Sequence, residues 1–424
     1  MERLRAYMAL CFVGFSIFVF GMGVRFDLSP LGIDAHYADP ELLRTRLLES
    51  CFYLHVQPPL YNLALGVVLK LCPGFETQAF YALSIATGLA LSLMLLTLMV
   101  RLGVSKKVSF ALAALFACSP SFILFQNLLL YTLQCAMLLT ASALLLHVFL
   151  AERRGWAGWG FFIALFLLGG IRSLYHLVYY IAVAAGVLAL MRPFWWRYAI
   201  MALIPGLLLF SFFVKSYVLF GQFTTSSFHG KSLWAKTVGN LPSPERVKLA
   251  EAGAISKVSL VDPFSAIDDY PPEVREVAGY EDIPVLRQKT KYTGEVNYNH
   301  LSELRISELY MQDAIYGLLH YPKAFVRSTA WAVLTFCSPS RLDAPSLGWL
   351  NTLYDRAAYG KIDVTLARYI PWLGASKHVP YVFLLIGLPT LFVFGLWRTM
   401  RSATIAERGV LLFMCFTIFY VGSL

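Results

Sequence analysis

The residue with the clearest chemical potential in this chain is Asp34, which lies in a polar segment directly after the first hydrophobic run. A carboxylate at the mouth of a low-dielectric helix bundle can accept a proton from a hydroxyl group that attacks a carbon atom. His36 and Tyr37 follow closely and are expected to line the same pocket. The competing interpretation is an aspartate that caps a helix or lies in a solvated loop, and the spacing alone leaves both open.

A second polar segment, His55-Val-Gln-Pro-Pro-Leu-Tyr61, comes before the next apolar run. Its two prolines fix a turn and remove two backbone donors, which leaves His55 and Gln57 to face a polar partner. We expect these two side chains, with Tyr61, to shape the floor of the pocket. The alternative is a rigid entry into the following helix.

Cationic residues lie at the ends of two later apolar runs. Arg172 follows a pair of glycines, and a guanidinium there can grip a phosphate group bidentately. The alternative is an arginine that snorkels to the membrane interface. Lys215 near the end of another run is interpreted in the same way, and His229 and Lys231 follow in a loop that could cover the site.

The composition defines the class of protein that must position these residues. Hydrophobic residues make up 58% of the 424-residue chain, charged residues only 14%, and the mean hydropathy is +0.63. Such values exclude a soluble globular chain and predict an all-α integral membrane protein. The formal net charge of +10 could suggest a nucleic-acid partner. Much of the basic excess lies in short loops between apolar runs, however, so we expect a lipid bilayer and no nucleic acid.

Apolar runs suited to crossing roughly 30 Å of hydrocarbon recur along the chain, and we expect about nine spans. They are placed near residues 6–24, 78–100, 108–125, 127–150, 156–170, 174–191, 198–218, 379–397 and 409–424. The first run is too long for a signal-peptide core and lacks a cleavage site, so it is predicted to be retained.

Basic residues in alternate loops predict the orientation of the chain. They are Arg3, Arg5, Arg101, Lys106, Lys107, Arg153, Arg154, Arg192 and Arg197. If all are cytoplasmic, the N-terminus is cytoplasmic as well, and segments 25–77 and 219–323 share the non-cytoplasmic side. Both polar regions could then form one site. The sequence leaves open whether that side is the periplasm, most simply of a bacterial inner membrane, or a eukaryotic lumen.

The predicted organisation has three parts. Residues 1–218 form a transmembrane core with a first outer loop at 25–77, in which 41–53 and 60–72 are expected to be interfacial helices. Residues 219–378 form a large non-cytoplasmic loop region with short helices, and residues 379–424 form the C-terminal spans. The run near 324–337 is interpreted as an interfacial or re-entrant helix, with a true crossing as the alternative. The chain stops within or just past an apolar run, which leaves open that the natural protein is longer.

Several short motifs follow one another in order over most of residues 1–340. They are Asp34 with Tyr37, His55-Val-Gln-Pro-Pro-Leu-Tyr61, Arg101-Leu-Gly103, Ser119-Pro120, Gly169-Gly-Ile-Arg172, Tyr217-Val-Leu-Phe-Gly221, Tyr321-Pro322 and Phe336-Cys-Ser-Pro339. In this topology the set resembles the polytopic glycosyltransferases of the GT-C class. The likeness is to the branch with protein O-mannosyltransferase and aminoarabinose transferase relatives and the RgtA/B/C/D-like domain.

The resemblance implies a GT-C-type helical bundle and a glycosyltransferase that inverts the anomeric carbon. The implied donor is a sugar on a polyprenyl phosphate, and the acceptor is a hydroxyl of a glycan, a lipid or a protein. Asp34 matches the family's general base. Many relatives carry an acidic pair there, whereas this chain has Ala35, so no metal site is indicated and no cofactor is assigned.

Two further readings stay open. A polysaccharide polymerase or ligase also combines many spans with one large outer loop, and differs mainly in its diphosphate-linked donor. The other is a non-catalytic scaffold of the GT-C type. It stays open because this chain has Ala35 where many relatives carry a second acidic residue. A transporter is disfavoured, since it would want ionisable residues at mid-membrane and broken helices in both halves.

Overall fold

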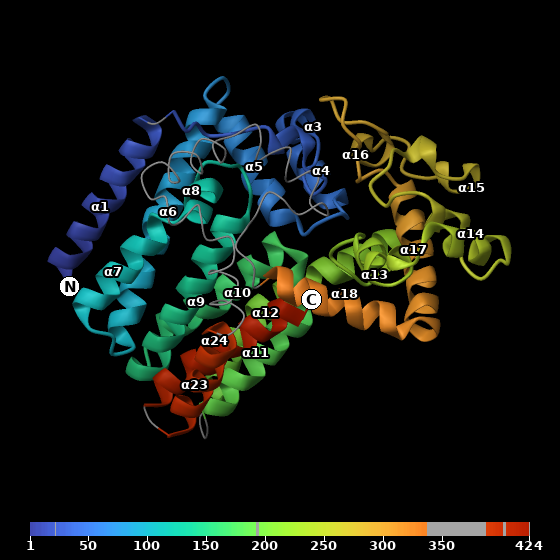
Figure 1. The fold of residues 1–424 in the computed structure, drawn as a ribbon. Coiled ribbons are helices and arrows are strands. Elements are labelled where there is room, and N and C mark those ends of the chain that lie inside the picture. The colour runs from blue at the N-terminus through green and yellow to red at the C-terminus, as the bar shows by residue number, and fades with distance from the viewer. Residues whose placement is uncertain (22, 192–194, 337–386, 402–403, 424) are drawn as a thin grey trace, which may run out of the picture.

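The computed structural model describes residues 1–21, 23–191, 195–336, 387–401 and 404–423 (Figure 1). Within these ranges the chain forms helices joined by turns, and its only β-pairing is two isolated bridges. The predicted all-α fold is therefore confirmed. Residues 337–378 of the predicted region 219–378 and the start of the predicted span 379–397 lie outside the described residues.

A bundle of mainly apolar helices forms the larger part of the molecule. Its members are α1 (Glu2–Gly21), α6 (Glu76–Arg101), α7 (Lys106–Ala117), α8 (Pro120–Gln126), α9 (Thr132–Glu152), α10 (Gly155–Ile171), α11 (Leu177–Leu190), α12 (Trp195–Phe220), α23 (Leu388–Arg401) and α24 (Ile405–Ser423). Helices α9 and α10 pack against each other in the interior, where Phe149, Phe161 and Phe162 are fully buried. Helix α1 instead exposes Leu10 and Ile17, as expected of a helix that faces lipid.

The structure supports fewer membrane spans than the sequence predicted. Among the described residues, five helices are long and apolar enough to cross a membrane, namely α1, α6, α9, α12 and α24. Helices α10 and α11 are apolar but have only 17 and 14 residues. The predicted span 108–125 is not one helix, because Ser119 caps a new helix at Pro120 and separates α7 from α8. The protein is thus an all-helical membrane protein, and the count of nine spans is not confirmed.

Short helices build segment 25–77, the segment predicted as the first outer loop and called so below. They are α2 (Pro30–Ile33), α3 (Pro40–Thr45), α4 (Leu47–Tyr53) and α5 (Pro59–Leu71). The expected single helix over 41–53 is wrong, since Arg46 leaves helical geometry with φ −128° and ψ 47°. The break buries Leu47 but leaves Leu48 77% exposed and Phe52 51% exposed. The expected helix over 60–72 is confirmed as α5, which packs against α3, α4 and α10.

The segment after α12 forms a separate lobe at the side of the bundle (Figure 1). Its helices are α13 (His229–Lys236), α14 (Ser243–Glu251), α15 (Pro272–Arg275), α16 (Pro284–Arg287) and α17 (Ser302–His320). Trp234, Tyr270 and Tyr310 are buried in a core that belongs to this lobe. The described part of the predicted region 219–378 is therefore ordered and helical, although α17 has 19 residues and is longer than the short helices expected. Its non-cytoplasmic location stays a prediction.

Helix α18 (Pro322–Phe336) joins the lobe to the bundle, because it packs against both α13 and α24. It corresponds to the predicted helix near 324–337. Its 15 residues span roughly 22 Å, less than the hydrocarbon thickness of a bilayer. Its interfacial position stays a prediction.

Close contact between α13 and α17 gives a first testable prediction. A Cβ atom at Gly230 would lie 1.9 Å from the Ser307 carbonyl oxygen, so the two helices can approach only because this position is glycine. We expect Gly230→Ala to destabilise the lobe by about 2 to 3 kcal/mol, seen as faster amide hydrogen exchange across α13 and α17. At Gly186 a Cβ meets no atom within 4 Å, so Gly186→Ala is the control. Equal exchange in the two variants would contradict this account of the contact.

Candidate functional site

Asp34 lies at the end of α2, where the chain leaves helical geometry, and only 2% of it is exposed. One carboxylate oxygen, Oδ1, accepts hydrogen bonds from the His36 backbone N–H at 2.8 Å and from the His36 ring Nδ1 at 2.9 Å. The second oxygen, Oδ2, accepts no hydrogen bond from any described residue. The carboxylate is therefore oriented through one oxygen, and the other keeps its lone pairs for a ligand.

An aromatic side chain, Tyr131, connects this carboxylate to Arg172. The His36 ring meets the Tyr131 ring edge-on, with the centroids 6.0 Å apart. The Arg172 guanidinium carbon lies 5.3 Å from the centroid of the same ring. Arg172 itself is half-buried at the end of α10 and makes no ion pair with any described residue. A buried carboxylate and a cation without an ion pair among the described residues thus lie at opposite ends of one short series of contacts.

Tyr37 and Tyr61 pack beneath this arrangement. Their ring centroids are 5.4 Å apart, and the Tyr61 ring lies 5.7 Å from that of Tyr131. Burial raises the pKa of the Tyr37 hydroxyl well above its usual value, so the group stays neutral and donates to the Leu129 carbonyl at 3.1 Å. The structure thus brings both predicted tyrosines together in an aromatic cluster with Tyr131.

His55 joins the first outer loop to the lobe and is 2% exposed. Its Nε2 lies 3.0 Å from the Asn299 carbonyl oxygen, which can only accept, so Nε2 carries the proton. Its Nδ1 then accepts from the Ser227 hydroxyl at 2.9 Å. Burial lowers the pKa of His55 to about 3, so the ring is neutral at physiological pH. His55 therefore acts here as a structural connection, and contact with a substrate stays a prediction.

Gln57 and Lys215 also make contacts that hold elements together. The Gln57 side-chain oxygen accepts from the Ser173 backbone N–H at 3.3 Å, next to Arg172. The Lys215 ammonium donates to the Leu54 carbonyl at 2.7 Å, at the end of α4, where a positive charge is favourable. Gln57 thus lies beside the predicted phosphate site. The Lys215 ammonium donates at least one of its hydrogen bonds to the backbone of the first outer loop.

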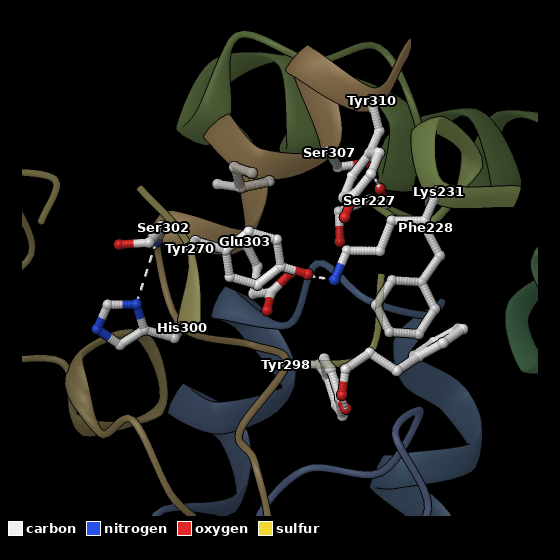
Figure 2. Close-up of polar contacts among 12 residues, drawn as sticks. Ser227, Phe228, Lys231, Tyr270, Tyr298, His300, Ser302, Glu303, Ser307 and Tyr310 are labelled. Atoms are coloured by element: carbon white, nitrogen blue, oxygen red, sulfur yellow. Dashed lines mark hydrogen bonds and ion pairs between the residues drawn. The ribbon is translucent and has the colours of Figure 1, made fainter. Parts of the chain in front are cut away.

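The two predicted residues of the covering loop differ in their surroundings. His229 is exposed at the start of α13, and its ring lies 3.4 Å from the Thr224 hydroxyl. Lys231 is 2% exposed and forms an ion pair with Glu303 of α17 (Figure 2). The Phe228, Phe264 and Tyr298 rings lie within 5.8 Å of its ammonium. The positive charge of Lys231 is therefore paired with a carboxylate inside the lobe.

The lobe nevertheless reaches His36, the hydrogen-bond partner of Asp34, because Phe228 contacts both His36 and Lys231. Its ring centroid lies 5.4 Å from that of His36 and 5.3 Å from the Lys231 ammonium. Segments 25–77 and 219–323 thus contact each other in the structure, and their forming one site stays a prediction.

Sequence reasoning missed three residues of the site. Asn62 bonds the Ala38 N–H at 2.8 Å and the His36 carbonyl at 3.1 Å, and so fixes the turn that carries His36. Tyr131 is the aromatic contact of Arg172. Lys291 donates to the Asp34 carbonyl at 2.7 Å across 257 residues of sequence. Asn62 follows the proline motif directly and could have been included, whereas the other two come from segments with no recognisable pattern.

The described residues contain no group of three or more His, Cys, Asp or Glu side chains arranged to hold a metal ion. Comparisons with protein-family models, curated proteins and solved structures find no match to this chain. The functional argument therefore depends on the geometry of the site.

His55 gives a prediction for the pH dependence of stability. Its pKa is near 6.5 in the unfolded chain and about 3 in the folded protein, so the unfolded state binds a proton first as the pH falls. The contribution of neutral, buried His55 to the free energy of unfolding is complete above pH 6.5. It declines as the pH falls toward 3, by about 1.4 kcal/mol per pH unit. We expect His55→Gln to be less stable at pH 7.5 but to lose less further stability by pH 5, as measured by thermal unfolding in nanodiscs.

The control is His320→Gln, because His320 is an exposed histidine of the same lobe. This variant should keep the acid sensitivity of the wild type. If His55→Gln kept it as well, His55 could not be its source.

Proposed function

We propose that this protein is a membrane glycosyltransferase of the GT-C type. It transfers a sugar from a polyprenyl-phosphate donor to an acceptor hydroxyl on the non-cytoplasmic face, with inversion at the anomeric carbon. The observation that carries the proposal is the buried Asp34 carboxylate, with one free oxygen, joined through His36 and Tyr131 to the unpaired Arg172.

The proposed reaction is a single displacement. Oδ2 of Asp34 takes the proton of the acceptor hydroxyl while the hydroxyl oxygen forms a bond to the anomeric carbon. The bond between that carbon and the phosphate oxygen breaks, and its electron pair leaves with the lipid phosphate. Attack opposite to the leaving group inverts the anomeric configuration. The Nδ1–H of His36 holds Oδ1, which keeps Oδ2 directed at the acceptor.

Arg172 has the role of stabilising the leaving phosphate. Its guanidinium is planar, stays charged at any working pH and can donate two parallel hydrogen bonds to phosphate oxygens. The half-buried position next to the Tyr131 ring lowers the local dielectric and strengthens that interaction. Lys215 has a supporting role in this proposal, since it fixes the end of α4 through Leu54.

The first test is replacement of the base. Asp34→Asn keeps Oδ1 as an acceptor for the His36 N–H, so the turn should stay intact while the base is lost. We expect transfer to fall by about 100-fold or more. The assay measures free polyprenyl phosphate released from a radiolabelled polyprenyl-phosphate sugar by purified protein in lipid, with an envelope extract as the source of acceptor.

Asp27→Asn is a matched control in the same outer loop. Asp27 accepts the Ser29 N–H at 2.8 Å, which is the local geometry that Asp34 has with His36. This variant should retain activity. Undiminished turnover by Asp34→Asn would remove the base assignment, and turnover only with a diphosphate-linked donor would favour a polymerase or ligase. Tight donor binding without any turnover would favour the non-catalytic scaffold.

Arg172 gives a second and independent test. Arg172→Gln removes the charge at the proposed phosphate site, and we expect kcat to fall by about 100-fold. Arg172→Lys should recover only part of the loss, because an ammonium cannot donate a parallel pair of bonds. Arg25→Lys is the control, since its guanidinium lies 3.9 Å from the centre of the Phe20 ring, outside the site. Equal losses in Arg25→Lys and Arg172→Lys would argue against a specific phosphate contact.

A further inference from the structure

A small hairpin in the lobe, residues 289–297, reaches across to the first outer loop. Thr290 and Val296 form an antiparallel bridge, and the Lys291 N–H donates to the Glu295 carbonyl at 2.7 Å. The turn closes at Gly294, whose φ of +85° suits glycine. At its base, the Asn297 side chain donates to the Val285 and Gln288 carbonyls, at 2.9 and 2.8 Å. The hairpin is thus a braced projection of the lobe.

Three consecutive residues of this hairpin contact the turn that carries Asp34. The Lys291 ammonium donates to the Asp34 carbonyl at 2.7 Å, and the Tyr292 N–H donates to the Asp39 carboxylate at 2.6 Å. The Thr293 hydroxyl donates to the Gly32 carbonyl at 3.2 Å. A Cβ atom at residue 32 would lie 2.8 Å from the Thr293 methyl carbon, so glycine permits this approach. The hairpin therefore holds the Gly32–Asp39 turn at both ends and in the middle.

Lys291 is an unusual residue for a purely structural contact. It is 3% exposed and makes no ion pair with a described residue. Burying an ammonium group costs several kcal/mol unless a specific interaction offsets it. Desolvation lowers its pKa to about 8, against the opposing influence of the nearby carboxylates of Asp34, Asp39 and Glu295. A neutral side chain of similar length would avoid that cost, so the charged donor at this carbonyl needs a reason.

The Asp34 turn needs external support. Asp34 follows α2, a helix of four residues, which is too short to be stable on its own. The Asp34 carbonyl also accepts from the Tyr37 N–H at 3.2 Å, so the Lys291 ammonium is its second donor. Displacement of a catalytic group by about 1 Å can lower a rate by about 100-fold. Fixing this carbonyl fixes the position from which the carboxylate projects.

We propose that Lys291 is the positioning residue for Asp34, and that the lobe thereby completes the active site through the 289–297 hairpin. This inference rests on the proposed function for its catalytic consequence. The physical contact can be tested without any assay of activity.

The test is amide hydrogen exchange on the full-length protein in nanodiscs, read at His36 and Tyr37. Both amides bond Asp34 and report on its turn. We expect Lys291→Met to speed their exchange by roughly fivefold or more, because the second donor to the carbonyl is lost. Lys291→Arg keeps the charge and should restore most of the protection.

Lys289→Met is the matched control on the same hairpin. Lys289 pairs with Asp268 on the surface, so its loss should leave the exchange of the Asp34 turn unchanged. Protection of α17 in the same samples reports whether the lobe is still folded. If Lys291→Met loosens α17 as well, Lys291→Gln, which keeps a polar end without the charge, is measured instead with the same expectation.

Kinetics separate failure of this inference from failure of the proposed function. With an active wild type, Lys291→Met should lower kcat by about 10- to 100-fold while the donor KM stays within about twofold. Unchanged exchange at His36 and Tyr37 overturns the positioning role, whatever the activity. Faster exchange in a protein whose wild type transfers no sugar upholds the contact and rejects the glycosyltransferase.

Discussion

The arrangement of this protein depends on one constraint: the polar first outer loop is buried between the helix bundle and the lobe. An unpaired buried polar group costs about 1 to 3 kcal/mol, so the buried polar groups of that loop are stabilised where they find protein partners. His55 meets the constraint with both ring nitrogens, one to Ser227 and one to Asn299. The neighbouring Val56 bonds through its carbonyl to Ser226 and through its N–H to Asn299. These bonds fix where the lobe sits against the loop.

The same burial creates a conflicting demand on Asp34. As the proposed base, Asp34 would have to be shielded enough for proton transfer to be favourable, yet not be neutralised by a permanent partner. The structure meets both demands by giving Oδ1 to His36 and by keeping Arg172 in contact with the Tyr131 ring instead of the carboxylate. A direct ion pair between Asp34 and Arg172 would satisfy both charges and leave neither available to a substrate.

The lobe also contains a buried ion pair that orients its own helices. Lys231 of α13 and Glu303 of α17 are both 1% exposed at the side chain, and the Ser307 hydroxyl of α17 donates to the Ser227 carbonyl just before α13. Buried pairs contribute little net stability, but a misplaced pair is costly, so they favour one arrangement over others. The register of α13 on α17 decides where Ser227 meets His55 and where Phe228 meets His36.

The sequence by itself determined the all-helical membrane class, the helices of the bundle interior and the ordered lobe, because these follow from local apolar length and spacing. It also predicted that the segments carrying Asp34 and His55 meet the later polar region. Helix breaks at Arg46 and Ser119 were missed, since a break depends on packing against other elements as well as on local propensity. Lys291 and Tyr131 could not be predicted, because their contacts to the site join residues far apart in sequence, and only the docking of the lobe and the bundle brings them there.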